Sequence, residues 1–178
     1  GYHMAVQGEE MATRIIHQAI ELGVNFFDSA NLYHRGLSDG IYGRALAGGL
    51  RQKVMLMTKC EDYSRDGSMK MLEDQLRRMK TDYLDLWQVH QVSELSEAEQ
   101  VLGPNGSLET FVKAKKEGKV RHIGFTGHRD PQVHLKLLNG TSEWETVQMP
   151  INLIDPHYLS FIETVLPVAR KKGLGVLA

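Results

Sequence analysis

An acid, an amine and an imidazole each close one of three short apolar runs in this chain. The runs are residues 24–28, 54–59 and 84–90. Their last residues, Asp28, Lys59 and His90, are spaced 31 residues apart. One strand–helix unit occupies roughly 30 residues, so this spacing predicts three consecutive parallel strands. Because active sites of barrel and open α/β proteins lie at the carboxyl ends of the strands, the three side chains are expected to meet at one catalytic site.

A tyrosine on the loop after the first run adds a group that can carry a proton. Tyr33 follows Asp28 by five residues. A lysine cation beside a phenol favours the ionised phenol, so Lys59 is expected to lower the pKa of Tyr33. The Asp28 carboxylate would hold Lys59 charged and in place, and His90 could hydrogen-bond a carbonyl oxygen. Together these groups predict an apparatus that adds or removes a proton at the oxygen of a carbonyl substrate.

Each of these residues also has a structural interpretation. Asp28 could cap a strand end, His90 could be an ordinary buried histidine, and Lys59 could form a buried ion pair with Asp28. An inward lysine after an apolar run must find a partner or lose its charge. Buried ion pairs contribute little net stability, however, so the structural interpretation gives little reason for placing one here. The combination of residues therefore favours chemistry.

Composition limits the class of protein. The chain has 178 residues, of which 42% are hydrophobic and 24% charged, with a net charge of −1. These values predict one soluble globular domain and give no electrostatic reason to expect nucleic acid or a membrane as a partner. No apolar stretch approaches the ~18 residues that cross a bilayer. Cys60 is the single cysteine, which excludes an internal disulfide and favours a reducing compartment, so we expect a cytoplasmic protein.

Strands and helices are expected to alternate along the whole chain. Predicted strands cover residues 24–30, 54–60, 84–89, 120–126, 147–153 and 173–177. Predicted helices cover residues 11–22, 38–46, 68–80, 107–117, 131–140 and 158–172, with residues 91–106 as a long polar loop. Ser38 and Asp130 are the expected caps of their helices. Within the strands, the alternation of side chains places Asp28, Lys59 and His90 on the face that holds the apolar residues of a barrel interior.

This alternation is typical of a parallel sheet with helices outside it. A closed (β/α)₈ barrel needs eight strands and roughly 250 residues. The chain shows six strands, and an open six-stranded arc would expose two long edges. We therefore expect residues 1–178 to form a single barrel domain whose first and last units are missing, or from which other segments are absent.

Five separated motifs carry a resemblance to a known family. They are Phe-Asp-Ser-Ala-Asn-Leu-Tyr at 27–33, Gly-Leu-Ser-Asp at 36–39, Met-Thr-Lys at 57–59, Asp-Tyr-Leu-Asp-Leu from 82 leading to the histidine at 90, and Gly-Lys-Val-Arg-His-Ile-Gly at 118–124. In this order they resemble the aldo-keto reductases. The resemblance covers nearly the whole chain and implies a TIM barrel, NADPH (NADP) as cofactor and a small carbonyl compound as substrate.

The resemblance also assigns roles. Asp28, Tyr33, Lys59 and His90 match the family's catalytic tetrad. The implied reaction reduces an aldehyde or ketone to an alcohol: Tyr33 protonates the carbonyl oxygen as hydride reaches the carbon, Asp28 and Lys59 tune Tyr33, and His90 orients the substrate.

The cofactor-binding residues implied by the resemblance are Thr126, Gly127 and Gln148. Many members end the strand after the glycine at 118 with Ser-Asn, which hold the nicotinamide amide. Here the same place reads Thr-Gly-His, so Thr126 can replace the serine while Gly127 brings no side chain. Gln148 matches the glutamine of the following strand. The family's segment for the adenosine phosphate lies beyond the seventh strand, outside this sequence.

Other functions remain as alternatives. The chain could be a non-catalytic NADPH-sensing subunit, like the aldo-keto-reductase-like β subunits of potassium channels, or a Schiff-base lyase using Lys59. Eight histidines invite a metal site, but no His-x-His pair ends a strand, so we expect no metal. His17 and His134 lie on predicted helices and are expected to be solvated. Cys60 is expected to be a small buried hydrophobe.

Overall fold

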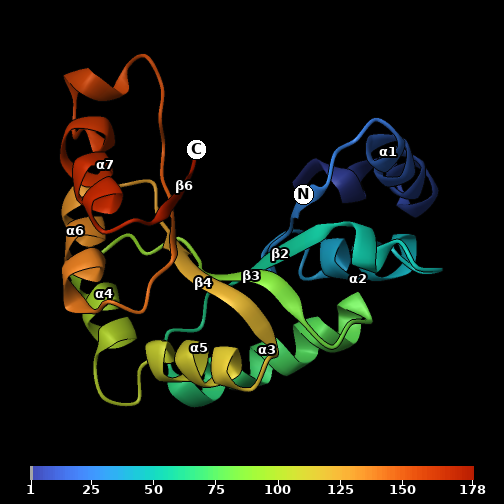
Figure 1. The fold of residues 1–178 in the computed structure, drawn as a ribbon, viewed down its shortest axis with the longest axis horizontal. Helices are drawn as coiled ribbons and strands as arrows, with labels where there is room; N and C mark the ends of the chain where they lie inside the picture. Colours follow the sequence, from blue (N-terminus) through green and yellow to red (C-terminus); the bar gives the residue numbers. More distant parts are fainter. Residues whose placement is uncertain (1) are drawn as a thin grey trace.

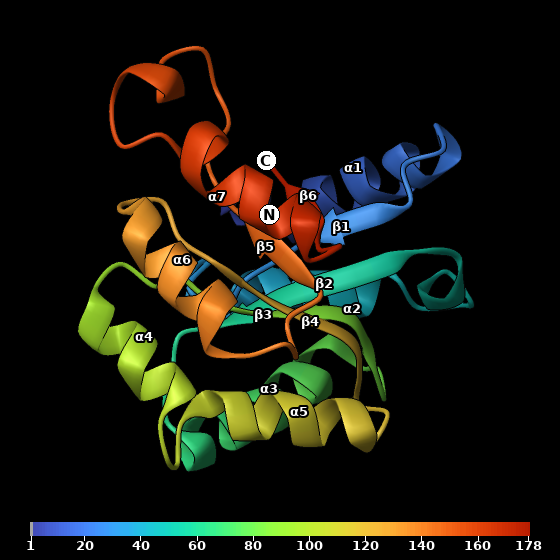
Figure 2. The same cartoon turned by 60° about the vertical axis from the view of Figure 1, so that its left-hand side comes forward.

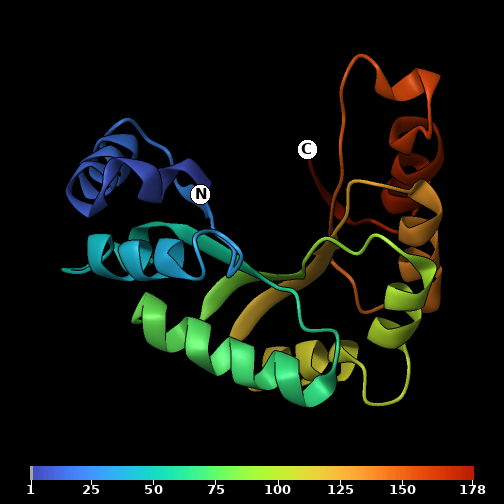
Figure 3. The ribbon, with the colours of Figure 1, turned by 180° about the vertical axis from the view of Figure 1, so that it is seen from behind.

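The computed structural model describes residues 2–178, where six strands form one parallel sheet in the order β1 to β6. The strands are β1 Phe26–Asp28, β2 Met55–Cys60, β3 Leu84–Val89, β4 Val120–Thr126, β5 Thr146–Gln148 and β6 Gly175–Leu177. The sheet curls into a half-barrel that is open on one side (Figures 1 and 3). The predicted strand–helix alternation and the incomplete (β/α)₈ barrel are confirmed.

Helices cover the convex face of this sheet. They are α1 Glu9–Glu21, α2 Leu37–Ala45, α3 Arg65–Met79, α4 Leu95–Leu102, α5 Ser107–Lys116, α6 Pro131–Gly140 and α7 Phe161–Lys171, with short 3₁₀ turns at Tyr2–Gln7, Arg51–Lys53 and Asp155–His157. Helices α3 and α5 lie side by side below β3 and β4. Helices α4, α6 and α7 stack beside one another on the side of the sheet where β6 lies (Figures 1 and 2). None of the helices in residues 2–178 combines the length and apolar character needed to span a bilayer.

Side chains alternate between the convex and the concave face of the sheet, as the sequence predicts. On the convex face the Trp87 ring stacks on Phe111 of α5, with ring centroids 3.8 Å apart, and both side chains are fully buried. The concave face carries an apolar hollow lined by Phe26, Met55, Leu86 and Leu177, among other residues. Asp28 lies two residues after Phe26, Lys59 lies four residues after Met55, and His90 lies four residues after Leu86. Even spacing within a strand keeps side chains on one face, so all three belong to the inward-facing rows of β1, β2 and β3. The barrel-interior rows predicted from the sequence are therefore confirmed.

Three predicted strands are at least two residues longer than the observed ones. The strand expected at 24–30 is reduced to Phe26–Asp28, the one at 147–153 to Thr146–Gln148 and the one at 173–177 to Gly175–Leu177. Val24 is 46% exposed, so its apolar side chain does not mark a buried strand residue. Beyond Gln148, Met149 donates one more backbone hydrogen bond to Leu177, and the chain then leaves the sheet for an exposed loop.

The predicted polar loop at 91–106 contains helix α4. The Glu97 carboxylate accepts hydrogen bonds from the backbone N–H groups of Ser93 (2.7 Å) and Glu94 (3.1 Å), which satisfies donors that a helix start leaves free. Ala98 and Val101 are fully buried. The expectation of an unstructured loop was wrong because charged residues on the outer side of α4 mask a short apolar stripe.

The starts of α1, α2, α3 and α7 also differ from prediction, and those of α2 and α3 have a clear local cause. Helix α2 begins after Gly36, whose φ of 82° suits glycine, and Ser38 lies inside the helix instead of capping it. Helix α3 begins at Arg65, because the Ser64 hydroxyl accepts a hydrogen bond from Gly67 N at 3.1 Å. The predicted cap at Asp130 is confirmed, since its carboxylate accepts from Gln132 N at 2.7 Å.

Candidate active site

The ends of β1 and β2 bring the predicted acid and amine together. The Lys59 ammonium donates to Asp28 Oδ1 at 2.5 Å and to the carbonyl oxygen of Ser29 at 2.9 Å. The Lys59 side chain is 2% exposed, whereas the Asp28 side chain keeps 32% of its surface in solvent. A desolvated ammonium needs such partners, because an unpaired charge inside a protein is costly. The pair therefore lies at the carboxyl edge of the sheet, with its ammonium buried and its carboxylate partly exposed to solvent.

Tyr33 reaches this pair from a sharply turned loop. Tyr33 N donates to Ala30 O at 3.0 Å, and the next two residues, His34 and Arg35, both have positive φ (52° and 55°). Such left-handed residues reverse the chain within a few positions. The Tyr33 ring centroid lies 5.3 Å from Lys59 Nζ. The turned loop thus places the phenol ring close to the ends of β1 and β2.

His90 completes the cluster from the end of β3. Its ring centroid lies 6.2 Å from that of Tyr33, and the two rings are almost perpendicular at 85°. The His90 side chain is nearly fully buried, and its Nδ1 has no hydrogen-bond partner among the described residues. The structure therefore places Asp28, Tyr33, Lys59 and His90 in one cluster. The catalytic roles of the four stay predictions.

Burial controls the protonation of three of these groups. It lowers the pKa of His90 to about 3, with the Lys59 cation as a second cause, so His90 is neutral near pH 7. Burial also lowers the pKa of Lys59, while the Asp28 carboxylate, and more weakly Asp39, act in the opposite direction. These directions follow from the cost of taking a charge out of water.

The expected lowering of the Tyr33 pKa is wrong. The pKa of Tyr33 is raised, first by burial of the phenol and second by the nearby Asp28 carboxylate, which disfavours a second negative charge. Burial and the Asp28 carboxylate therefore decide the direction of this pKa, and not the Lys59 cation on which the expectation rests. A raised pKa keeps the phenol protonated near neutrality.

The residues predicted to bind the cofactor lie along the ends of β4 and β5. Thr126 Oγ1 accepts from Gln91 N and its carbonyl oxygen accepts from Val92 N, both at 2.9 Å. Gly127 N donates to the carbonyl oxygen of Gln148 at 3.3 Å. The side-chain oxygen Oε1 of Gln148 is buried and has no partner among residues 2–178. A buried amide oxygen without a donor is the kind of group that a ligand completes.

Gly127 is required by close packing. A Cβ atom at this position would lie 2.5 Å from Val92 O and 2.6 Å from His134 Cε1. Real Cβ atoms do not approach backbone oxygens so closely, so the asparagine found here in many family members would not fit without movement. The departure at Gly127 therefore reflects the neighbouring loop and α6. His134, expected to be solvated, is fully buried here, and its Nε2 lies 3.3 Å from Gln148 O.

The family follows from a comparison with known proteins. A family model described as the aldo/keto reductase family matches residues 3–178. The chain belongs to the aldo/keto reductase family. It is 32% identical to the uncharacterized oxidoreductase YrpG of Bacillus subtilis, over 96% of this chain and 57% of that protein.

Solved structures of other aldo/keto reductases share the fold. The holo form of aldo-keto reductase AKR11C1 from Bacillus halodurans has a TM-score of 0.79 and 28% identity, covering 94% of this chain and 56% of that one. An aldo-keto reductase from Klebsiella pneumoniae in complex with NADPH has a TM-score of 0.77 and 25% identity, covering 98% of this chain and 58% of that one. The chain thus spans just over half the length of the relatives it matches.

Sequence reasoning missed part of the site of this aldo/keto reductase. Asp39 lies within the Gly-Leu-Ser-Asp motif and Arg78 lies in the last turn of α3, but neither residue is predicted from the sequence to belong to the site. Asp39 accepts a hydrogen bond from Ser29, next to Asp28 at the end of β1. Arg78 donates to Asp39 and so contacts the strand end through this carboxylate. The signal was the family motif's own acidic position, but only the structure shows what that carboxylate contacts.

Proposed function

We propose that the protein takes part in the NADPH-dependent reduction of an aldehyde or ketone, with Tyr33 as the proton donor. The observation that carries this proposal is the cluster of Tyr33, Lys59, Asp28 and His90 at the carboxyl edge of the half-barrel. Family membership supports the reaction class. The chain covers just over half the length of the relatives it matches, so the activity of the whole protein is also part of the proposal.

Each residue of the cluster has a role that its environment supports. The protonated phenol of Tyr33 gives its proton to the carbonyl oxygen of the substrate. The Lys59 cation, close to the ring, stabilises the negative charge that then develops on the phenol. Asp28 keeps Lys59 oriented and charged, and neutral His90 can donate one hydrogen bond to the same substrate oxygen.

The residues at the ends of β4 and β5 fit the nicotinamide end of a cofactor. Gln148 offers a buried Oε1 that has no hydrogen-bond donor within the described part of the chain, and a carboxamide N–H could satisfy it. Thr126 retains its hydroxyl proton as a donor, because its oxygen accepts from Gln91 N. When bound, NADPH supplies the hydride that reaches the carbonyl carbon. We choose NADPH because the Klebsiella pneumoniae neighbour was solved with it.

A nicotinamide cofactor titration tests this proposal. On mixing with the protein, NADPH fluorescence should shift or quench, and a panel of aldehydes and ketones should then oxidise the bound cofactor. Gln148→Met should weaken NADPH binding about tenfold, since it removes one buried hydrogen bond. The matched change Gln132→Met, on the exposed surface of α6, should leave binding unchanged. No fluorescence change with the unaltered protein would refute the proposal.

The Schiff-base alternative receives less support from the geometry. A lyase lysine must present a neutral, accessible amine to its substrate. The Lys59 ammonium is 2% exposed and already donates to Asp28 and to Ser29 O. We therefore retain reduction as the proposed reaction.

A further inference from the structure

A second carboxylate, Asp39, lies behind the cluster on helix α2 and is fully buried. Its Oδ1 accepts from the hydroxyl of Ser29 at 2.7 Å and from the hydroxyl of Thr58 at 3.1 Å. Its Oδ2 accepts from Arg78 Nη2 of α3 at 3.1 Å. Three donors from three different segments thus converge on one carboxylate.

The two hydroxyl donors are the chain neighbours of the candidate catalytic residues. Ser29 follows Asp28 at the end of β1, and Thr58 precedes Lys59 in β2. Successive side chains of a strand point to opposite faces, so Ser29 and Thr58 face the helices while their neighbours face the site. Asp39 therefore joins the two strand ends from behind. Because Ser29 O also accepts from Lys59 Nζ, fixing the Ser29 residue fixes one contact of the ammonium.

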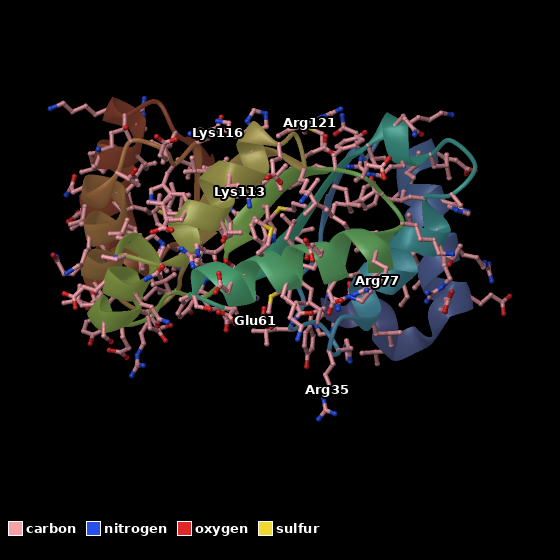
Figure 4. The ribbon with its side chains drawn as sticks, turned by 90° about the horizontal axis from the view of Figure 1, so that it is seen from below. Arg35, Glu61, Arg77, Lys113, Lys116 and Arg121 are labelled. Atoms are coloured by element: carbon pink, nitrogen blue, oxygen red, sulfur yellow. The ribbon has the colours of Figure 1, made fainter. Side chains whose placement is uncertain are left out.

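Arg78 extends this connection to the loop that carries the tyrosine. The same Nη2 atom that contacts Asp39 donates to Asn31 Oδ1 at 2.7 Å, two residues before Tyr33. A Cβ at Gly36 would lie 2.9 Å from the Arg78 guanidinium carbon, so the guanidinium packs directly on the far end of this loop. Its neighbour Arg77 marks the C-terminal end of α3, where this helix approaches α2 (Figure 4).

Helix α3 holds β2 through a further residue. Gln75 is fully buried, and its Nε2 donates to Lys59 O at 2.7 Å. Its Oε1 accepts from Trp87 Nε1 at 2.8 Å, which fixes the amide from the β3 side. The backbone of Lys59 is thus held by α3, while the hydroxyl one residue earlier is held by Asp39. The position of the Lys59 side chain depends on both.

The charge of Asp39 also acts on Lys59. Ionisable groups surround Lys59 from four elements and their loops: Asp28, Tyr33, Asp39, His90 and His128. Of these, the Asp28 and Asp39 carboxylates favour the charged ammonium, and Asp28 has the larger effect. Burial raises the pKa of Asp39 itself, while the bonds from Ser29 and Arg78 act against that rise. A buried, paired carboxylate adds little net stability, so its placement here suggests a positioning task.

We propose that Asp39 is a positioning residue that fixes the ends of β1 and β2, and through Arg78 the tyrosine loop, so that Lys59 keeps its charge and its distance to Tyr33. The inference rests on the proposed reductase function for its effect on turnover. Its effect on Lys59 does not depend on that function.

The test compares Asp39→Asn with the matched change Asp66→Asn, whose carboxylate is 86% exposed. The titration of Lys59 is followed by the chemical shift of its Nζ in ¹⁵N-labelled protein, assigned by its loss in Lys59→Met. In Asp39→Asn, Lys59 should lose its proton at lower pH, because one of two supporting carboxylates has become neutral. Turnover should fall ten- to a hundredfold, mainly in kcat, with its alkaline limb moved to lower pH.

A second pair of variants keeps the charge of Asp39. Thr58→Val removes one hydroxyl from the carboxylate and should lower kcat about fivefold, the equivalent of one hydrogen bond. Thr58→Ser keeps the hydroxyl and should restore kcat. This pair decides the question if Asp39→Asn does not fold.

Two outcomes would overturn the inference. One is Lys59 titrating identically in Asp39→Asn and Asp66→Asn. The other is Thr58→Val and Thr58→Ser giving the same kcat. A protein that reduces no carbonyl compound would refute the proposed function, and the Lys59 titration would still decide the role of Asp39.

Discussion

Lys59 is the residue whose surroundings best separate a structural from a chemical interpretation. A purely structural ion pair would be satisfied by Asp28 alone. Here the ammonium also lies 5.3 Å from the Tyr33 ring centroid and interacts with the more distant Asp39 carboxylate. Burial lowers the pKa of Lys59, and two carboxylates act in the opposite direction. Such opposing effects around one amine are typical of functional sites, where protonation states are adjusted to a task.

His134 gives a prediction about stability and pH. Its ring is fully buried between Phe125 and Phe161, at centroid distances of 5.2 and 5.0 Å, and burial lowers its pKa to about 4. In the unfolded chain a histidine has a pKa of about 6.5. Between these values the unfolded state binds more protons, so stability rises with pH. The contribution is complete above about pH 6.5 and is lost as pH falls through about 4.

His134→Gln should therefore make the free energy of unfolding less dependent on pH. Between pH 6.5 and 4, the slope should decrease by up to about 1.4 kcal/mol per pH unit. Buried His90, with a pKa of about 3, supplies a similar slope that remains in the variant. Urea unfolding at several pH values measures both slopes. An unchanged slope in His134→Gln would show that this ring is not kept neutral by the fold.

At the scale of elements, sequence patterns predict the strands well where a full apolar run is buried. The strands β2, β3 and β4 match their predicted ranges closely, because each lies in the middle of the sheet with both faces covered along most of its length. The strands toward the two ends of the sheet, β1, β5 and β6, are shorter than predicted. Their flanking apolar residues, such as Val24 and Ile151, remain exposed, so hydrophobicity overstates these strands.

Local signals explain the helix that prediction missed. Helix α4 spans only eight residues, four of them polar or acidic, and its apolar stripe is narrow. What identifies it is the bonding of Glu97 to two preceding backbone N–H groups, which depends on geometry. The cluster at the strand ends was predictable because parallel strands bring their carboxyl ends together. The contacts of Asp39 and Arg78 were not, because they depend on how α2 and α3 pack.

The junction of β4 and α6 carries a prediction about Gly127. Gly127→Ala forces a Cβ to within 2.5 Å of Val92 O, so the loop after β3 must move. The free energy of unfolding should fall by about 1–3 kcal/mol. Gly175→Ala is the matched control in β6, where the new Cβ would make an ordinary contact of 3.5 Å with Thr146. Equal stabilities of the two variants in urea unfolding would contradict the close packing at Gly127.

At the scale of the whole molecule, one curved sheet brings distant residues to a common edge. Because the strands are parallel and ordered β1 to β6, the candidate catalytic residues lie at the ends of β1, β2 and β3, and the candidate cofactor residues lie at the ends of β4 and β5. Substrate and cofactor would therefore meet across the middle of the sheet. The even spacing of Asp28, Lys59 and His90 already predicts this arrangement, because it follows from the strand–helix repeat.

The most direct test of the account is the role of Tyr33 in a single turnover. The decay of NADPH absorbance is followed with a carbonyl substrate found in the panel, in Tyr33→Phe and in the matched variant Tyr158→Phe, whose side chain is 77% exposed. Tyr33→Phe should slow the reaction at least about a hundredfold, the usual contribution of a general acid, while NADPH still changes its fluorescence on binding. Equal rates in the two variants would contradict Tyr33 as the proton donor.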